Sequence, residues 1–178
     1  NWAKDGIYDH GGTKAMTEAL ASPHEVSGAA HLPAAVAGRS AVDYVAGGGR
    51  AVTAIRVEGP EPSVAHRCEA LRALLAPLGD TEELHTENSQ TLWREIRDAT
   101  YLAADQERHI WRLSVPPTEG SRVALQILEG RLGEALYDWG GGLIWLALGV
   151  APDACANVVR QRVAAAHRAA FERLQTKM

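Results

Sequence analysis

The stretch that decides the fold is HIWRLSVPPTEGSRVALQILEGRLGEALYDWGGGLIWLAL, residues 109–148. Apolar and polar residues alternate over residues 109–115, which is the period-two pattern of a strand with two unlike faces. Pro116 and Pro117 cannot continue a sheet ladder, so we expect the strand to end there and a helix to follow. Residues 143–148 are apolar throughout, which favours a central strand covered on both sides.

Outside this stretch, hydrophobic periodicity predicts further strands and helices. Two strands are expected upstream, over residues 25–32 and 51–57, and prolines followed by a helix come after the second. The remaining expected elements are a first strand ending at residues 6–8, a glycine turn at 11–13, a short helix up to 22, an edge strand at 81–86, a helix from 88 or 89, and a final helix from 152.

Two units of the chain share one order of elements, namely strand, proline turn, helix and return strand. The first unit begins at residues 55–57 and the second at residues 111–113, and each has an arginine before its last apolar strand residue. Doubled units of this kind usually pair into one antiparallel sheet. The sequence therefore predicts an α+β fold: a ferredoxin-like antiparallel sheet with helices packed on one face, built from two strand–helix–strand repeats.

Residues 1–167 are predicted to form one domain, and residues 168–178 a C-terminal helix. The helical pattern that starts at residue 152 runs through His167 and Arg168 without a loop. Two interpretations stay open: one long helix, or a helix that follows residues missing from this chain between His167 and Arg168. The chain has no initiator Met and starts inside or just before an expected strand, so we expect a fragment of a longer protein.

Composition and motif spacing argue against several classes of function. A formal net charge of −4 gives no reason to expect a nucleic-acid partner. No apolar run approaches the roughly 18 residues of a membrane span, so direct membrane insertion is not expected. Cys68 and Cys155 lack metal-ligand spacing, and no metal is predicted. The glycine clusters at 47–49 and 140–142 lack the spacing of phosphate-binding and dinucleotide-binding loops.

Several segments, in this order, resemble one known family. They are VSGAAHLP (26–33), RVEGPEPSVAHRCEALRALL (56–75), LWREIRD (92–98), WRLSVPP (111–117) and LYDWGGGLIWLAL (136–148). From about residue 13 to residue 167 the chain resembles the C-terminal half of the FAD-binding subunit of bacterial glycolate oxidase, a FAD-linked oxidase of the vanillyl-alcohol-oxidase type.

This resemblance implies the cap, or substrate, domain of a FAD-dependent 2-hydroxy-acid oxidoreductase that converts glycolate to glyoxylate. FAD would be held mainly by an N-terminal domain absent from this chain, so the fragment alone would be inactive. The implied partners are a second flavoprotein subunit and an iron–sulfur subunit of the same oxidase complex. The implied location is the cytoplasm, peripheral to the inner membrane through that complex.

Oxidation of a 2-hydroxy acid needs a cation for the carboxylate, a base for the hydroxyl proton and a flavin that accepts hydride. Arg112 is the best candidate cation, because guanidinium binds carboxylate bidentately and the opposite strand face, with Trp111 and Leu113, should pack on helices. Arg56 is a similar candidate; both arginines also fit an ordinary solvated role. His31 is the candidate base or orienting residue, and a structural, hydrogen-bonded histidine is the alternative.

Trp139 with Gly140, Gly141 and Gly142 is predicted to form a ring-and-backbone platform against a flavin or substrate. The alternative is a glycine bulge in the sheet. A different class of function also stays open, in which the chain is a non-catalytic ferredoxin-like assembly module whose sheet face docks another subunit. A FAD-binding domain encoded upstream would favour the oxidoreductase.

Overall fold

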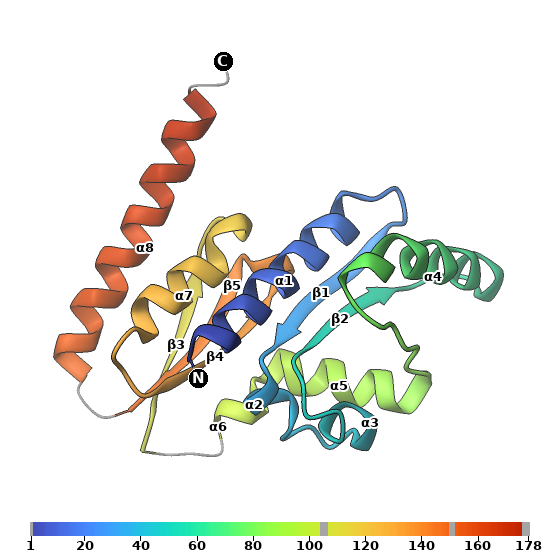
Figure 1. Ribbon diagram of the computed structural model, residues 1–178, viewed down its shortest axis with the longest axis horizontal. Helices are drawn as coiled ribbons and strands as arrows, with labels where there is room; N and C mark the ends of the chain where they lie inside the picture. Colours follow the sequence, from blue (N-terminus) through green and yellow to red (C-terminus); the bar gives the residue numbers. More distant parts are fainter. Residues whose placement is uncertain (1, 104–106, 150–151, 176–178) are drawn as a thin grey trace.

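The computed structural model describes residues 2–103, 107–149 and 152–175. In this part of the chain, α-helices surround one open, antiparallel five-stranded sheet with strand order β2-β1-β4-β5-β3, so the fold is α+β (Figure 1). The strands are β1 (Val26–Leu32), β2 (Val52–Val57), β3 (His109–Ser114), β4 (Gly133–Asp138) and β5 (Leu143–Leu148).

The helices vary from single turns to long rods. They are α1 (Trp2–Ala21), α2 (Ala34–Ala37), α3 (Asp43–Ala46), α4 (Glu61–Leu75), α5 (Thr86–Asp98), α6 (Thr100–Ala103), α7 (Gly120–Leu128) and α8 (Pro152–Gln175), with 3-10 turns η1 (Ala76–Leu78), η2 (Pro117–Glu119) and η3 (Trp139–Gly141). None of the helices in the described ranges combines the length and apolar character that a bilayer crossing requires.

Residues 109–148 form one compact unit. β3 and β4 each pair antiparallel with β5, so they run parallel to each other with β5 inserted between them, and α7 connects them. This is a split strand–helix–strand arrangement. In β5 every residue except Trp145 is buried, which confirms the prediction of a central strand covered on both sides.

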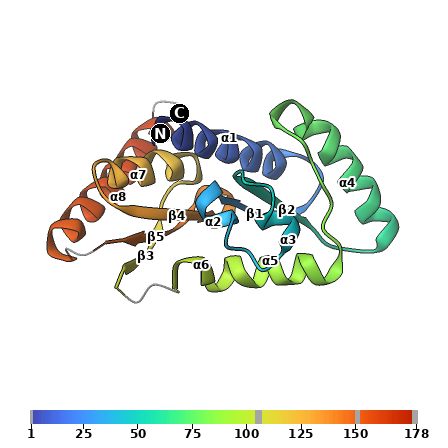
Figure 2. The ribbon, with the colours of Figure 1, turned by 60° about the horizontal axis from the view of Figure 1, so that its bottom comes forward.

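Helices cover both faces of the sheet, so the prediction of helices on one face is wrong. One core cluster joins α1, α7 and α8 to side chains such as Tyr137 and Ile144 of the central strands. A second cluster joins α2, α3, α5 and α6 to Leu136 and Ala147 of the same strands. Figure 2 shows the sheet between these two helical layers. Because β4 and β5 are apolar on both sides, both sides need cover.

The N-terminal segment is helical, so the predicted strand at residues 6–8 and the predicted glycine turn at 11–13 are wrong. Both lie inside α1. Gly12 has a packing role: a Cβ atom there would lie 2.0 Å from Nδ1 of His31 on β1. Because Gly12 has no side chain, α1 can lie directly on the sheet. In the sequence this glycine resembled a turn residue, but in the structure it is a point of close contact between a helix and a strand.

The first of the two predicted repeats is incomplete. After α4 and η1, residues 81–85 form no strand, and Thr86 already begins α5, so the predicted edge strand at 81–86 is wrong. Glu82 and Glu83 in this segment are exposed and charged, which suits a solvated connection better than a sheet ladder. Of the two predicted repeats, only the second, β3–α7–β4, has the strand–helix–strand form within the described residues.

The C-terminal helix α8 runs without interruption through His167 and Arg168. The domain boundary predicted between these residues therefore falls inside one helix, as the long-helix interpretation expected, while residues 176–178 of the predicted C-terminal helix lie outside the described residues. The imidazole Nε2 of His167 lies 3.1 Å from the carbonyl oxygen of Ser114 and connects α8 to β3.

The β1 and β4 strands diverge soon after they meet. Within the described residues their register holds one residue pair, His31 with Tyr137, since β4 ends at Asp138 and the chain turns through η3 into β5. The turn uses left-handed backbone at Trp139 (φ 51°), Gly140 (φ 65°) and Gly141 (φ 93°), which explains two of the three glycines. The N-terminal half of β1 therefore extends beyond the end of the β4–β5 hairpin.

Candidate functional site

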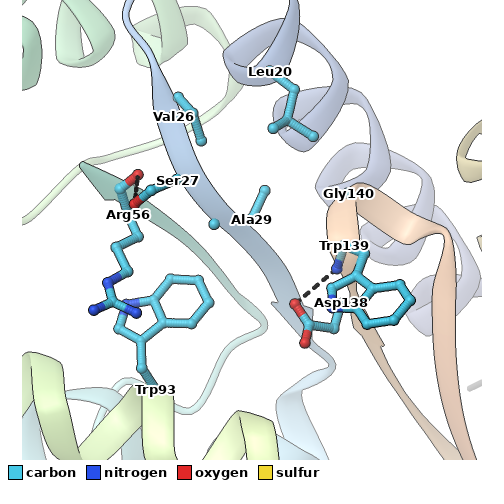
Figure 3. A pocket seen from close by; sticks show the side chains of 10 residues that line it. Leu20, Val26, Ser27, Ala29, Arg56, Trp93, Asp138, Trp139 and Gly140 are labelled. Atoms are coloured by element: carbon cyan, nitrogen blue, oxygen red, sulfur yellow. Dashed lines mark hydrogen bonds between the residues drawn. The ribbon is translucent and has the colours of Figure 1, made fainter. Parts of the chain in front are cut away.

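An open depression lies where β1 leaves β4. Its volume is about 370 Å³. Figure 3 shows Arg56 and Trp93 on one side of β1, and Asp138 and Trp139 on the other. The lining residues come from α1, β1, β2, α5, β4 and η3: Leu20, Val26, Ser27, Gly28, Ala29, Arg56, Trp93, Asp138, Trp139 and Gly140.

The first side of the depression is an arginine–tryptophan pair. The guanidinium carbon of Arg56 on β2 lies 5.8 Å from the ring centroid of Trp93 on α5, and its Nη2 donates a hydrogen bond of 2.7 Å to the carboxylate of Glu58. The register neighbour of Arg56 on β1 is Gly28. A Cβ atom at Gly28 would lie 3.1 Å from Cη2 of Trp93, so the glycine allows the indole to rest on the strand.

The second side holds a partly buried carboxyl group. Burial raises the pKa of Asp138 above its ordinary value, and a hydrogen bond from the backbone N–H of Trp139 offsets only part of that effect. This bond, 2.7 Å long, reaches Oδ1 of Asp138. Among the described residues no arginine, lysine or histidine forms an ion pair with Asp138. A carboxyl group in such a place is a candidate proton acceptor or hydrogen-bond partner.

Arg112 stacks on the same tryptophan but is not among the residues that line the depression. Its guanidinium carbon lies 5.0 Å from the ring centroid of Trp139 and 5.8 Å from that of Trp145. As predicted, the other face of β3 packs on helices, with Leu113 buried, while Arg112 is exposed. Within the part of the chain that the structure describes, the Arg112 side chain has no hydrogen bond or ion pair, so its charge is available to an anion.

His31 lies apart from these residues. Its side chain is 2% exposed, its Nδ1 is hydrogen-bonded to Oγ1 of Thr53 at 2.8 Å, and its ring packs near Tyr137 with centroids 6.0 Å apart. It faces Gly12 of α1 and does not line the depression. This environment matches the structural, hydrogen-bonded alternative for His31.

The three glycines of the predicted platform pack against the chain itself. A Cβ atom at Gly140 would lie 2.3 Å from Cδ1 of Leu20, and one at Gly141 would lie 2.7 Å from the carbonyl oxygen of Pro117. A Cβ atom at Gly142 would lie 3.3 Å from Cγ of Pro117. The glycines therefore serve a tight turn packed on α1 and η2. The exposed part of the predicted platform is the indole of Trp139, which is 59% exposed.

The structure thus brings together some of the predicted site residues. Arg56, Trp139 and Gly140 line one depression, and Arg112, which does not line it, stacks on Trp139. Sequence reasoning missed Asp138 and the role of Trp93. The only signal for Asp138 was a lone acid at a strand end directly before Trp139 and the glycines. Within the described residues, no group of three or more His, Cys, Asp or Glu side chains could hold a metal ion.

A scan against protein-family models found no match for this chain, and a search of curated proteins found none similar to it.

Proposed function

We propose that this chain is the cap domain of a FAD-dependent 2-hydroxy-acid oxidoreductase, of the type of the FAD-binding subunit of bacterial glycolate oxidase. The observation that carries the proposal is the grouping of Arg112, Trp139 and Asp138. A guanidinium with no carboxylate partner among the described residues stacks on one exposed indole, and a partly buried carboxyl group directly precedes that tryptophan in the chain. A 2-hydroxy acid offers a carboxylate and a hydroxyl group as the complementary pair.

Arg112 is the residue proposed to bind the substrate carboxylate. Two indoles, of Trp139 and Trp145, hold its guanidinium in place, which reduces the conformational entropy lost on binding. Arg56 is less suitable, because Glu58 already pairs with it. β2 and β3 form opposite edges of the sheet, about 19 Å apart at the usual strand spacing, so a small acid would contact only one of the two arginines.

Asp138, rather than His31, is proposed to accept the hydroxyl proton. His31 is buried away from the depression, whereas Asp138 lines it and lies next to Trp139 in the chain. A general base needs to reach the proton that it removes, and position is decisive before pKa. Because the pKa of Asp138 is raised, it lies closer to neutral pH, where a general base works best.

Among the described residues, the exposed indole of Trp139 is the surface that best suits contact with FAD. Leu20 and Pro117 occupy the space next to the glycines beside Trp139, so these glycines leave no room for a dinucleotide. The exposed indole of Trp139, in contrast, suits contact with a planar ring. We propose that another domain of the protein holds FAD and that Trp139 packs near its ring. When bound, FAD supplies the acceptor for the hydride that leaves the substrate.

The assembly role is the second candidate function. It is favoured by the apolar surface at Trp139 and at Ile110 of β3, which are 59% and 41% exposed. In this version a ferredoxin-like module built around β3, α7, β4 and β5 docks a second flavoprotein subunit or an iron–sulfur subunit. Peripheral association with the inner membrane would follow from that assembly.

The test is turnover of glycolate by the full-length flavoprotein in its assembled complex. Arg112→Gln should lower kcat/KM by about 100-fold or more, because a charge-assisted pair of hydrogen bonds to the substrate is lost. Arg72→Gln removes an exposed, Glu83-paired arginine on α4 and should leave turnover within about twofold. If Arg112→Gln assembles and turns over glycolate normally, the assembly role stands and the oxidoreductase site does not.

A further inference from the structure

The outer face of α8 takes no part in the proposed site. On the inner face, Val159 and Ala166 are buried in the core cluster that includes α7 and the central strands. Nε2 of His167 lies 3.1 Å from the carbonyl oxygen of Ser114 on β3. One face of α8 is therefore fixed to the domain, and the opposite face is held as a rigid surface. In Figure 1 the C-terminal end of α8 stands clear of the other helices.

This outer face carries uncompensated positive charge, although the chain as a whole has a formal net charge of −4. Arg160 and Arg168 are exposed, and neither has a hydrogen bond or an ion pair among the described residues. Exposed arginines elsewhere pair with nearby carboxylates, as Arg72 of α4 does with Glu83. The two guanidinium groups of α8 are therefore available to an anionic partner.

Four residues form a continuous stripe along the outer face, called here the α8 stripe. Arg160, Ala164, Arg168 and Phe171 follow one another at spacings of four, four and three residues, which places them on one side of an α-helix. All four are exposed, and Phe171, the only phenylalanine of the chain, is 61% exposed. The two arginines are about 12 Å apart along the helix axis.

The composition of the α8 stripe favours a protein helix as its partner. Arginine and aromatic residues are enriched in protein interfaces, and the distance at which two helices pack depends on the side chains between them. The small side chain of Ala164 allows a second helix to approach closely, while the arginines on either side of it can reach that helix. A membrane surface fits less well, because an interfacial helix needs several large apolar side chains and the stripe offers only Phe171.

Charge decides between a second copy of this chain and a different protein. If two α8 helices packed antiparallel around Ala164, Arg160 of one copy would lie opposite Arg168 of the other, and like charges opposite each other are unfavourable. An acidic helix brings carboxylates to the same positions, where guanidinium groups bind them with charge-assisted hydrogen bonds.

We propose that the α8 stripe docks an acidic α-helix of a partner protein. Carboxylates about two turns apart on that helix pair with Arg160 and Arg168, and an apolar side chain of the partner packs on Phe171. The inner face of α8 is already anchored to the domain, so little conformational entropy is lost when the partner binds. The stripe includes none of the residues assigned to the oxidoreductase site, so its test is independent of turnover.

The experiment is photo-crosslinking of the full chain in the cells that naturally produce it. A photoreactive benzoylphenylalanine at Gln161, an exposed position beside the stripe, should crosslink to an acidic helix of another protein, and mass spectrometry identifies the linked peptide. Arg160→Glu combined with Arg168→Glu should lower the yield at least about tenfold, because like charges then face each other. Arg162→Glu makes the same change at an exposed, unpaired arginine of α8 outside the stripe, and should leave the yield within about twofold.

The same experiment defines the results that would overturn the proposal. These results are no crosslink, a crosslink to lipid, to a second copy or to another segment of the same chain, a linked peptide without acidic residues, and equal losses for Arg162→Glu and the double variant. Phe171→Ala tests the apolar contact without a change in charge. It should fold normally, since Phe171 is largely exposed, and lower the yield at least about threefold, and an unchanged yield would contradict the proposed packing.

Discussion

Two carboxyl groups on different parts of the molecule are buried to different degrees and differ in whether cations compensate their charge. Glu119 in η2 is 4% exposed and accepts hydrogen bonds from Arg122 of α7 and Arg173 of α8. Asp138 at the end of β4 is partly buried, and it accepts a hydrogen bond from the backbone N–H of Trp139. The first group is neutralised by two cations, and the second by none among the described residues.

The pKa directions follow this difference. Burial disfavours the charged form of Glu119, yet the hydrogen bonds and charges of Arg122 and Arg173 outweigh it and lower its pKa. For Asp138, burial prevails and raises the pKa. A carboxylate with a lowered pKa stabilises the fold, while one with a raised pKa costs stability when ionised. A group retained in spite of that cost is a functional candidate.

The largest effect on folding should come from Glu119→Gln. The variant leaves Arg122 and Arg173 without their shared anion and weakens the connection of α7 to the end of α8. Both arginines are partly exposed, so we expect a moderate loss of about 2 kcal/mol in the free energy of unfolding. Urea denaturation measures it, with Glu129→Gln, an exposed change just after α7, as the control. A loss no larger than that of the control would remove the structural role of Glu119.

The Glu119 contribution should also depend on pH with a definite sign. Its pKa is lowered on folding, so its stabilising effect is fully present above the unfolded-state value of about 4.3 and is lost as pH falls through the folded-state pKa. The difference in unfolding free energy between wild type and Glu119→Gln should therefore shrink below about pH 4. Unfolding curves at pH 7, 5 and 3 test this, and a constant difference across them would contradict it.

Asp138→Asn should change folding least and in the opposite direction. The amide oxygen can still accept the hydrogen bond from Trp139, and the cost of burying a charge disappears. We expect unchanged stability or a gain of up to about 1 kcal/mol at pH 7. Because the folded-state pKa is raised, this gain should vanish at low pH, where the wild-type carboxyl is protonated. A clear loss of stability at pH 7 would make Asp138 a structural residue.

The sequence predicted most of the sheet, because alternation and prolines are strong local signals. The strands at 25–32, 51–57 and 109–115 were placed within one residue of β1, β2 and β3. The segment 143–148 became β5 as expected. These strands contain β-branched or aromatic residues and end at proline or glycine, so local chemistry and tertiary packing agree.

The predictions that were wrong or incomplete concern features that depend on tertiary contacts or on a residue type with more than one structural role. Gly12 was taken as a turn residue, but it is a point of close contact between α1 and His31. The second face of the sheet was missed, although Leu136 and Ala147 supply apolar side chains there. Asp138 carried no signal by spacing, because its role comes from the divergence of β1 and β4, a tertiary feature. Residues 81–86 were given a strand that their exposed glutamates do not support.

We propose that Asp138, the carboxyl without a cation partner among the described residues, serves the chemistry, whereas Glu119, the carboxyl with two cations, serves the fold. The most direct measurement is kcat/KM for glycolate oxidation by the proposed FAD-dependent oxidoreductase, for Asp138→Asn beside Glu119→Gln. We predict that Asp138→Asn lowers kcat/KM at least about 100-fold while it folds normally, as expected for loss of a general base. Glu119→Gln should keep kcat/KM within about threefold at a temperature where it is folded. Full activity of Asp138→Asn would contradict the account.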